Sequence, residues 1–138
     1  MEFKILDNLN DEIVNIRREA FIEGRGVPEE LELDGRDSEL MHFCLYDGDI
    51  LLAYLRAERI ENYLHIGRVA VKENRRGSGL GKMLMEYLFD YAKAEKLVFI
   101  ELSAVDTAVG FYVKMGFTTE GNFYLETGVP HIYMKKEL

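Results

Sequence analysis

The amino-acid sequence predicts an α/β fold with a mixed sheet in a single domain over residues 1–138. Two observations carry this prediction. Apolar segments with strand-like spacing are interleaved with segments of helical periodicity, in the order β-α-β-β-β-α-β-α-β-β. One of the helices is long and joins two strands, so these strands should run parallel, whereas short turns elsewhere require antiparallel pairs.

The first half of the chain is expected to form a strand, a helix and three further strands. Residues 2–6 alternate in polarity, and Asn10 or Asp11 is a candidate N-cap for a helix that Gly24 and Gly26 end. The turn sequences Asp-Gly-Asp and Glu-Asn then separate the strands of an antiparallel meander, over residues 40–46, 50–60 and 63–71.

The second half is expected to complete the sheet around two helices. The long helix runs from Leu80 to about Glu95, and the short apolar strand that follows should lie inside the sheet, parallel to strand 63–71. A short helix capped by Asp106 or Thr107 comes next. The remaining elements are this helix over 108–115, the strands over 97–103, 117–124 and 131–136, and the last turn over 128–130.

The segment over residues 27–37 is rich in carboxylates and allows two interpretations. It is either a solvated acidic face or a loop on the substrate side that holds a general base. Its apolar residues would attach it to the body of the protein in both cases.

Composition limits the possible partners and the compartment. The formal net charge of −8 argues against nucleic acid or an acidic membrane as a main partner and suits an amine-bearing substrate. The single Cys44 has no partner for a disulfide and is expected to be a buried small residue. No apolar segment is long enough to cross a bilayer and the N-terminus does not resemble a signal peptide, so we expect a cytoplasmic protein.

A glycine-rich loop between strand 63–71 and the long helix is the strongest functional signal. Arg75 and Arg76 precede three alternating glycines, which allow close approach of the backbone to a ligand where a helix begins. Such a loop is predicted to bind the diphosphate of a cofactor. The spacing fits neither a Walker loop, because Met83 stands where a hydroxyl is needed, nor the G-x-G-x-x-G dinucleotide loop.

Two motifs resemble one known family. The run from Arg76 to Gly81 is similar to the R/Q-x-x-G-x-G/A loop of the GNAT N-acetyltransferase superfamily. The tail from Ala108 to Phe117 is similar to that family's A-x-x-F/L-Y-x-K/R-x-G-F signature. The resemblance covers essentially the whole chain and implies a GNAT (acyl-CoA N-acyltransferase) fold with acetyl-coenzyme A as cofactor. Four further segments, over residues 27–32, 34–37, 67–71 and 128–131, resemble the ElaA-like or YjcF-like branch of this family.

The resemblance also implies roles for particular residues. Tyr112 matches the tyrosine that lies by the cofactor sulfur and can protonate it, although a tyrosine on such a helix is also a common core residue. Val105 stands where many members have Asn, which puts one side-chain contact in doubt. The residues expected to bind the cofactor are Val69, Ala70, Val71, Arg75, Arg76, Gly77, Ser78, Gly79, Leu80, Gly81 and Lys82.

The general base stays open at this level. His131 and Glu30 are the first candidates, because a histidine can titrate near neutral pH and Glu30 lies in the acidic segment. A chain of waters is another possibility. The further candidates are Glu32, Asp34 and Asp37, whereas His42 and His65 lie on predicted strands and are expected to be packed residues.

The sequence therefore favours an acetyl-coenzyme A-dependent N-acetyltransferase that acts on a primary amine of a small molecule or peptide, as a monomer or homodimer. The alternative from another class is a non-catalytic module that senses acyl-coenzyme A, which the replacement at Val105 supports and Tyr112 opposes. A nucleotide phosphohydrolase is disfavoured because the Walker residues are missing.

Overall fold

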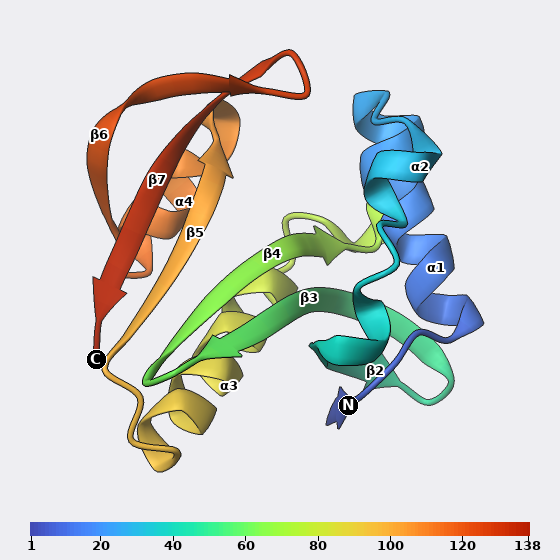
Figure 1. Ribbon diagram of the computed structural model, residues 1–138. Coiled ribbons are helices and arrows are strands. Elements are labelled where there is room, and N and C mark those ends of the chain that lie inside the picture. Colours follow the sequence, from blue (N-terminus) through green and yellow to red (C-terminus); the bar gives the residue numbers. More distant parts are fainter.

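Seven strands form one mixed sheet in the order β1-β2-β3-β4-β5-β7-β6 (Figure 1). The computed structural model describes all residues, 1–138. Neighbouring strands are antiparallel except β4 and β5, which pair in parallel as the sequence predicts. The strands are β1 (Glu2–Leu6), β2 (Met41–Asp47), β3 (Ile50–Ile60), β4 (Tyr63–Val71), β5 (Phe99–Val105), β6 (Thr118–Glu126) and β7 (Val129–Glu137).

Helices cover both faces of this sheet, because each face carries its own apolar cluster. One cluster joins Leu84 and Leu88 of the long helix to the sheet, and Tyr112 belongs to it. The other joins Ile13 and Ile16 to the opposite face. None of the helices is long and apolar enough to cross a membrane. The helices are α1 (Asp11–Arg17), α2 (Glu29–Glu32), α3 (Leu80–Ala94) and α4 (Val109–Lys114).

The first helical segment begins as the sequence predicts but does not stay a regular α-helix. The Asn10 side chain accepts a hydrogen bond from the Ile13 amide at 2.8 Å and so caps α1. A π-helical segment, Arg18–Glu23, follows directly, and the helical conformation ends at Gly26 with a φ of +69°. Such π-helical turns are rare and are frequently found at functional sites.

The strand after α3 starts two residues later than predicted. Leu97 belongs to the end of the helix, because its amide donates to the Ala92 carbonyl at 2.9 Å and Lys96 adopts a φ of +59°. The apolar character of Leu97 therefore reflects packing under the helix end and not a place in β5. Neither predicted cap of the short helix is used, since Ala108 precedes α4 without a side-chain hydrogen bond.

The final hairpin turns one residue earlier than predicted. Thr127 and Gly128 have φ values of +50° and +77°, the paired left-handed conformation of a tight two-residue turn. Pro130 consequently lies within β7, opposite Leu125 of β6. The strand tolerates it because the ladder between β5 and β7 begins only at His131.

Candidate active site

The central strand β4 carries a bulge that opens the sheet. Tyr54 pairs with Ala70 while Arg56 pairs with Gly67, so β4 holds one more residue than β3 between these two pairs. Arg68, inside the bulge, has a φ of +55°, which is uncommon for a residue other than glycine. The pairing of β4 with β5 stops at Ile66, and Figure 1 shows the two strands diverging beyond it.

The diverging strands leave a groove beside the N-terminus of α3, which we call the α3 groove. It has a volume of about 400 Å³. Gly79, with a φ of +82°, precedes α3 without a side-chain cap, so the first amides of this helix are free to bind an anion. The groove is lined by Arg25, Val69, Ala70, Val71, Gly77, Gly79, Leu80, Gly81, Lys82, Ala108, Phe111 and Tyr112.

Eight of the residues predicted to bind the cofactor therefore line one groove, and three do not. Arg75, Arg76 and Ser78 are exposed on the loop beside it. Arg76 Nε donates to the Val71 carbonyl at 3.2 Å, and the Ser78 hydroxyl donates to the Arg75 carbonyl. These bonds shape the loop, and the first of them holds the Arg76 side chain against the end of β4.

Tyr112 lies at the inner end of this groove. Its side chain is 7% exposed and packs edge-on against Phe111 and Phe117. Burial raises the pKa of the Tyr112 hydroxyl to about 12, and the nearby charge of Arg25 opposes this rise. The hydroxyl is therefore protonated at neutral pH.

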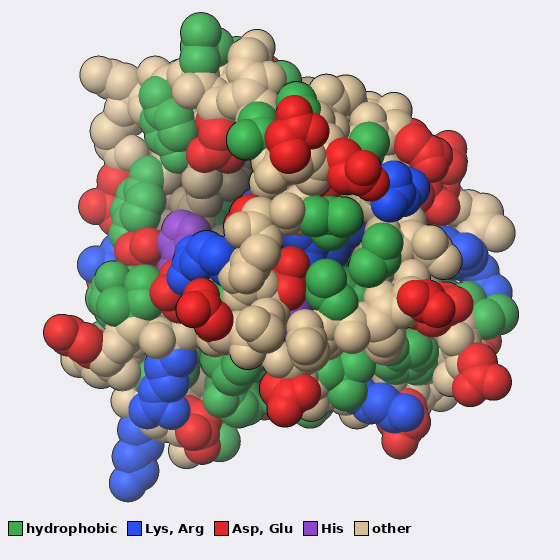
Figure 2. All heavy atoms as spheres, turned by 45° about the vertical axis from the view of Figure 1, so that its right-hand side comes forward, with side chains coloured by type: hydrophobic (Ala, Val, Ile, Leu, Met, Phe, Trp, Pro, Cys, Tyr) green, Lys and Arg blue, Asp and Glu red, His purple; other side chains and the backbone are tan.

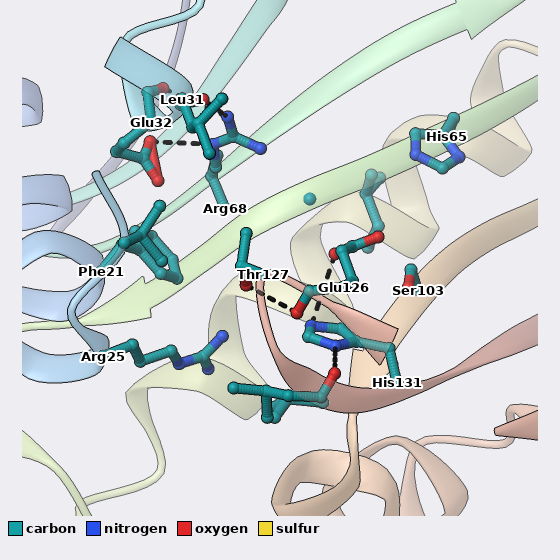
Figure 3. A pocket seen from close by; sticks show the side chains of 15 residues that line it. Phe21, Arg25, Leu31, Glu32, His65, Arg68, Ser103, Glu126, Thr127 and His131 are labelled. Carbon is teal, nitrogen blue, oxygen red and sulfur yellow. Dashed lines mark hydrogen bonds and ion pairs between the residues drawn. The ribbon is translucent and has the colours of Figure 1, made fainter. Parts of the chain in front are cut away.

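A second hollow, which we call the hairpin cavity, lies between the α1–α2 segment and the β6–β7 hairpin (Figure 3). Its volume is about 310 Å³. A smaller pocket of about 60 Å³ joins it to the α3 groove, because Arg25 and Tyr112 line this pocket together with Ser103 and Val105. The groove and the cavity thus form one continuous path that narrows at Tyr112.

His131 stands on the hairpin side of this path. It is 6% exposed and pairs across the sheet with Val105. Its Nδ1 lies 2.8 Å from the Val129 carbonyl, which can only accept, so Nδ1 donates this hydrogen bond. Glu126 Oε2 lies 3.4 Å from Nε2.

Most carboxylates of the acidic segment are held by arginines, a pairing that the sequence did not reveal. Arg17 is completely buried and donates to Glu32 and Asp37. Arg56 binds Asp34 and Asp37, while Arg68 binds Glu32 and Asp34. We call these six residues the charge cluster: Arg17, Arg56, Arg68, Glu32, Asp34 and Asp37.

The charge cluster leaves the acidic segment with few free carboxylates near the cavity. Glu30 is exposed on α2 and is not among the residues that line the hairpin cavity. Figure 2 shows acidic side chains on this face mixed with basic and hydrophobic ones, without one acidic patch. The segment therefore gives no direct support to a cationic acceptor.

The remaining histidines have different surroundings. His65 lines the hairpin cavity and lies 2.7 Å from a Glu101 oxygen, with its side chain 44% exposed. His42 is fully buried between the Tyr54 hydroxyl and the Asp37 carbonyl, and burial lowers its pKa. His42 is thus a core residue that lies outside both hollows.

Comparison with known proteins identifies the family. A family model described as an acetyltransferase (GNAT) domain matches residues 5–138. The chain belongs to the GNAT acetyltransferase family. GNAT relatives include the N-acetyltransferase YjcF of Bacillus subtilis, 30% identical over 88% of each chain, and ElaA of Escherichia coli, 30% identical over 91% of this chain and 86% of that protein.

Solved structures agree with this assignment. An acyl-CoA N-acyltransferase from Pseudomonas aeruginosa superposes with a TM-score of 0.84 at 30% identity, covering 98% of both chains. The crystal structure of Escherichia coli ElaA also gives 0.84, at 27% identity over 99% of both. The GNAT fold and the ElaA-like or YjcF-like branch predicted from the sequence are thus confirmed.

The cofactor class follows at the level of the family. An aminoglycoside 6'-N-acetyltransferase and the PaiA N-acetyltransferase of Thermoplasma acidophilum were crystallised with coenzyme A and share this fold, with TM-scores of 0.78 and 0.74. Acetyl-coenzyme A is the typical cosubstrate of GNAT proteins, in agreement with the prediction from the glycine loop.

Proposed function

We propose that this protein transfers an acetyl group from acetyl-coenzyme A to a primary amine of a small molecule or peptide. The observation that carries the proposal is the continuous path from the α3 groove to the hairpin cavity, with Tyr112 where the two meet. A cofactor and an acceptor entering from opposite ends would meet at this tyrosine.

The α3 groove supplies the cofactor site in this proposal. The free amides at the start of α3 and the charges of Arg75 and Arg76 bind the diphosphate. The edge of β4 from Val69 to Val71, which has no β5 partner, supplies main-chain groups to the pantetheine arm and to the thioester carbonyl. Such groups are fixed in direction before the substrate binds, which favours stabilisation of the oxyanion.

The chemical step needs a base and a proton donor. An ammonium with a pKa of about 10.4 is almost wholly unreactive at neutral pH, so the acceptor must first lose a proton. His131 Nε2 takes this proton, and Glu126 stabilises the imidazolium that forms. The amine nitrogen then bonds to the acyl carbon, the carbon–sulfur bond breaks, and Tyr112 donates its hydroxyl proton to the departing sulfur. The nitrogen loses its second proton to become the amide nitrogen, and this proton restores the Tyr112 hydroxyl. Glu30 has no part in this scheme, because it does not line the cavity.

Measurement of thiol release from acetyl-coenzyme A with a panel of amines tests the proposal. The variant Tyr112→Phe should lower kcat by about 10²-fold or more, the range of general acid catalysis, and leave coenzyme A affinity within about twofold. Tyr87→Phe is the matched control, since Tyr87 packs on Phe3 and lines none of the hollows.

Calorimetric titration with coenzyme A separates this proposal from the alternative of a sensor module. Binding together with release of thiol in the presence of an amine supports the enzyme. Binding with no release for any acceptor would favour the non-catalytic sensor instead. If coenzyme A does not bind to the wild-type protein at all, both interpretations are wrong.

A further inference from the structure

One cation at the junction of the two hollows has no acidic partner. Arg25, the last helical residue before Gly26, lines the hairpin cavity, the connecting pocket and the α3 groove. It takes part in none of the ion pairs of the molecule. Its guanidinium lies over the ring of Phe21, 5.2 Å from the centroid. This stacking orients the side chain without neutralising its charge.

Arg68, the other arginine that lines the hairpin cavity, is already paired. Arg68 donates to Glu32 at 2.8 Å and lies 3.5 Å from Asp34. Glu126, on the opposite wall, lies beside His131. Arg25 therefore keeps a guanidinium that no carboxylate of the protein binds, and this group can bind an anionic group of a ligand.

Arg25 also lies close to the place where the proposed reaction occurs. It shares the connecting pocket and the α3 groove with Tyr112, and its charge acts on the Tyr112 hydroxyl. In Figure 3 its side chain extends toward the wall formed by Thr127 and His131. An anion held by this guanidinium would lie near an amine that attacks the thioester. The acceptor must therefore carry its amine and its anionic group close together. An amine and a carboxylate bonded to one carbon atom meet this requirement.

The walls of the hairpin cavity indicate the rest of the acceptor. Phe21, Ile66 and Val105 are buried apolar residues of the lining, and Val27, Leu31 and Val129 extend the apolar surface. A side chain attached to the same carbon would therefore contact apolar groups.

We infer that the acceptor is a free α-amino acid with an apolar side chain, and that Arg25 determines this specificity by binding its α-carboxylate. The inference rests on the proposed function and names its acceptor. The guanidinium and the carboxylate can form two parallel hydrogen bonds, which a neutral group cannot reproduce. The α-carboxylate is unchanged in the reaction, in which the ammonium loses one proton to His131, gains the acetyl group and loses a second proton that replaces the one Tyr112 gives to the sulfur.

The test compares acceptors that differ only in this charge. Thiol release is measured with leucine, methionine and phenylalanine, with their amides, and with the amines that lack the carboxylate. The wild-type protein should acetylate the amino acids with a kcat/KM about tenfold or more above that of the amides, as expected for a charge-assisted contact. The α-amine of an amino-acid amide is less basic than that of the free amino acid, so a larger part of it is unprotonated at neutral pH. Intrinsic reactivity alone would therefore give the amides the higher kcat/KM.

Variants then assign the effect to one side chain. Arg25→Gln should lower kcat/KM for the amino acids about tenfold or more and leave the values for amides and simple amines within about twofold. Arg18→Gln is the matched control, because Arg18 lies on the same continuous helical stretch, seven residues before Arg25, but pairs with the exposed Glu29. Coenzyme A affinity of Arg25→Gln, measured by calorimetry, should equal that of the wild type.

Three results would overturn the inference. Equal use of amino acids and amides by the wild-type protein would remove the role of the carboxylate, while leaving the proposed acetyltransferase activity intact. An equal loss for all acceptors in Arg25→Gln, together with weaker coenzyme A binding, would place Arg25 in the cofactor site. Failure of every amino acid as acceptor would exclude this substrate class, and the wider amine panel would then decide on the proposed function separately.

Discussion

Replacement of Arg17 by Gln should strongly destabilise the protein, because its charge is buried against two carboxylates. The Arg17 side chain has no exposed area, and its nitrogens lie 2.7 Å from Glu32 Oε2 and 2.6 Å from Asp37 Oδ1. The charge cluster contains three arginines and three carboxylates, so its formal charge is balanced in the wild type. Arg17→Gln leaves one buried negative charge without compensation.

The size of the effect follows from what remains after the substitution. Loss of one partner of a buried ion pair costs about 3–5 kcal/mol of unfolding free energy. Here Arg68 still lies 2.8 Å from Glu32, and Arg56 still lies 3.3 Å from Asp37. We therefore expect a loss near the lower end, about 3 kcal/mol, which corresponds to a decrease in Tm of about 10 °C for a chain of this size.

Urea denaturation followed by circular dichroism measures this loss, and the neighbouring residue provides the control. Arg18 pairs with Glu29 at 2.6 Å, but these side chains are 42% and 52% exposed, so Arg18→Gln should cost at most about 1 kcal/mol. If the unfolding free energies of the two variants agree within about 1 kcal/mol, the charge cluster does not stabilise the fold in the way argued here.

Three further predictions concern the loop, the response to acid and the single thiol. Gly79→Ala should lower the unfolding free energy by about 1 kcal/mol, because Gly79 has a φ of +82°, whereas Gly81→Ala, inside α3, should be neutral or stabilising in the same denaturation assay. Stability should fall as pH decreases below 6.5, because burial lowers the pKa of His42 and the unfolded chain then binds a proton that the folded chain does not. It should fall further below pH 3.8, because Asp34, despite its partial burial, has its pKa held well below its usual range by Arg56; denaturation midpoints against pH check both steps. Burial raises the pKa of the Cys44 thiol to about 12, so a thiol reagent should modify Cys44 only in denaturant, and rapid labelling of the native protein would contradict this.

The sequence by itself determined the structural elements that depend on residues close together in the chain. The turn between β2 and β3, the glycine loop, the length of α3 and the parallel crossover into β5 follow from φ requirements, periodicity and the handedness of connections. The motif around Tyr112 and the loop after Arg76 were also sufficient to indicate the GNAT family. The boundaries that were wrong lie where a residue such as Leu97 is apolar because a helix end covers it, and not because it belongs to a strand.

Only the tertiary structure decided which charges are paired and which is free. Arg17 and Glu32 are 15 residues apart, and Arg68 and Glu32 are 36 residues apart. No local spacing distinguishes these arginines from Arg25. Their partners depend on the order of the strands, on the extra residue in β4 and on the point where the pairing of β4 with β5 ends. These features determine which side chains come into contact. For the same physical reason, the carboxylates of the segment that the sequence suggested as a source of the base pair with arginines of α1, β3 and β4. The candidate acceptor site likewise lies between residues from opposite ends of the chain.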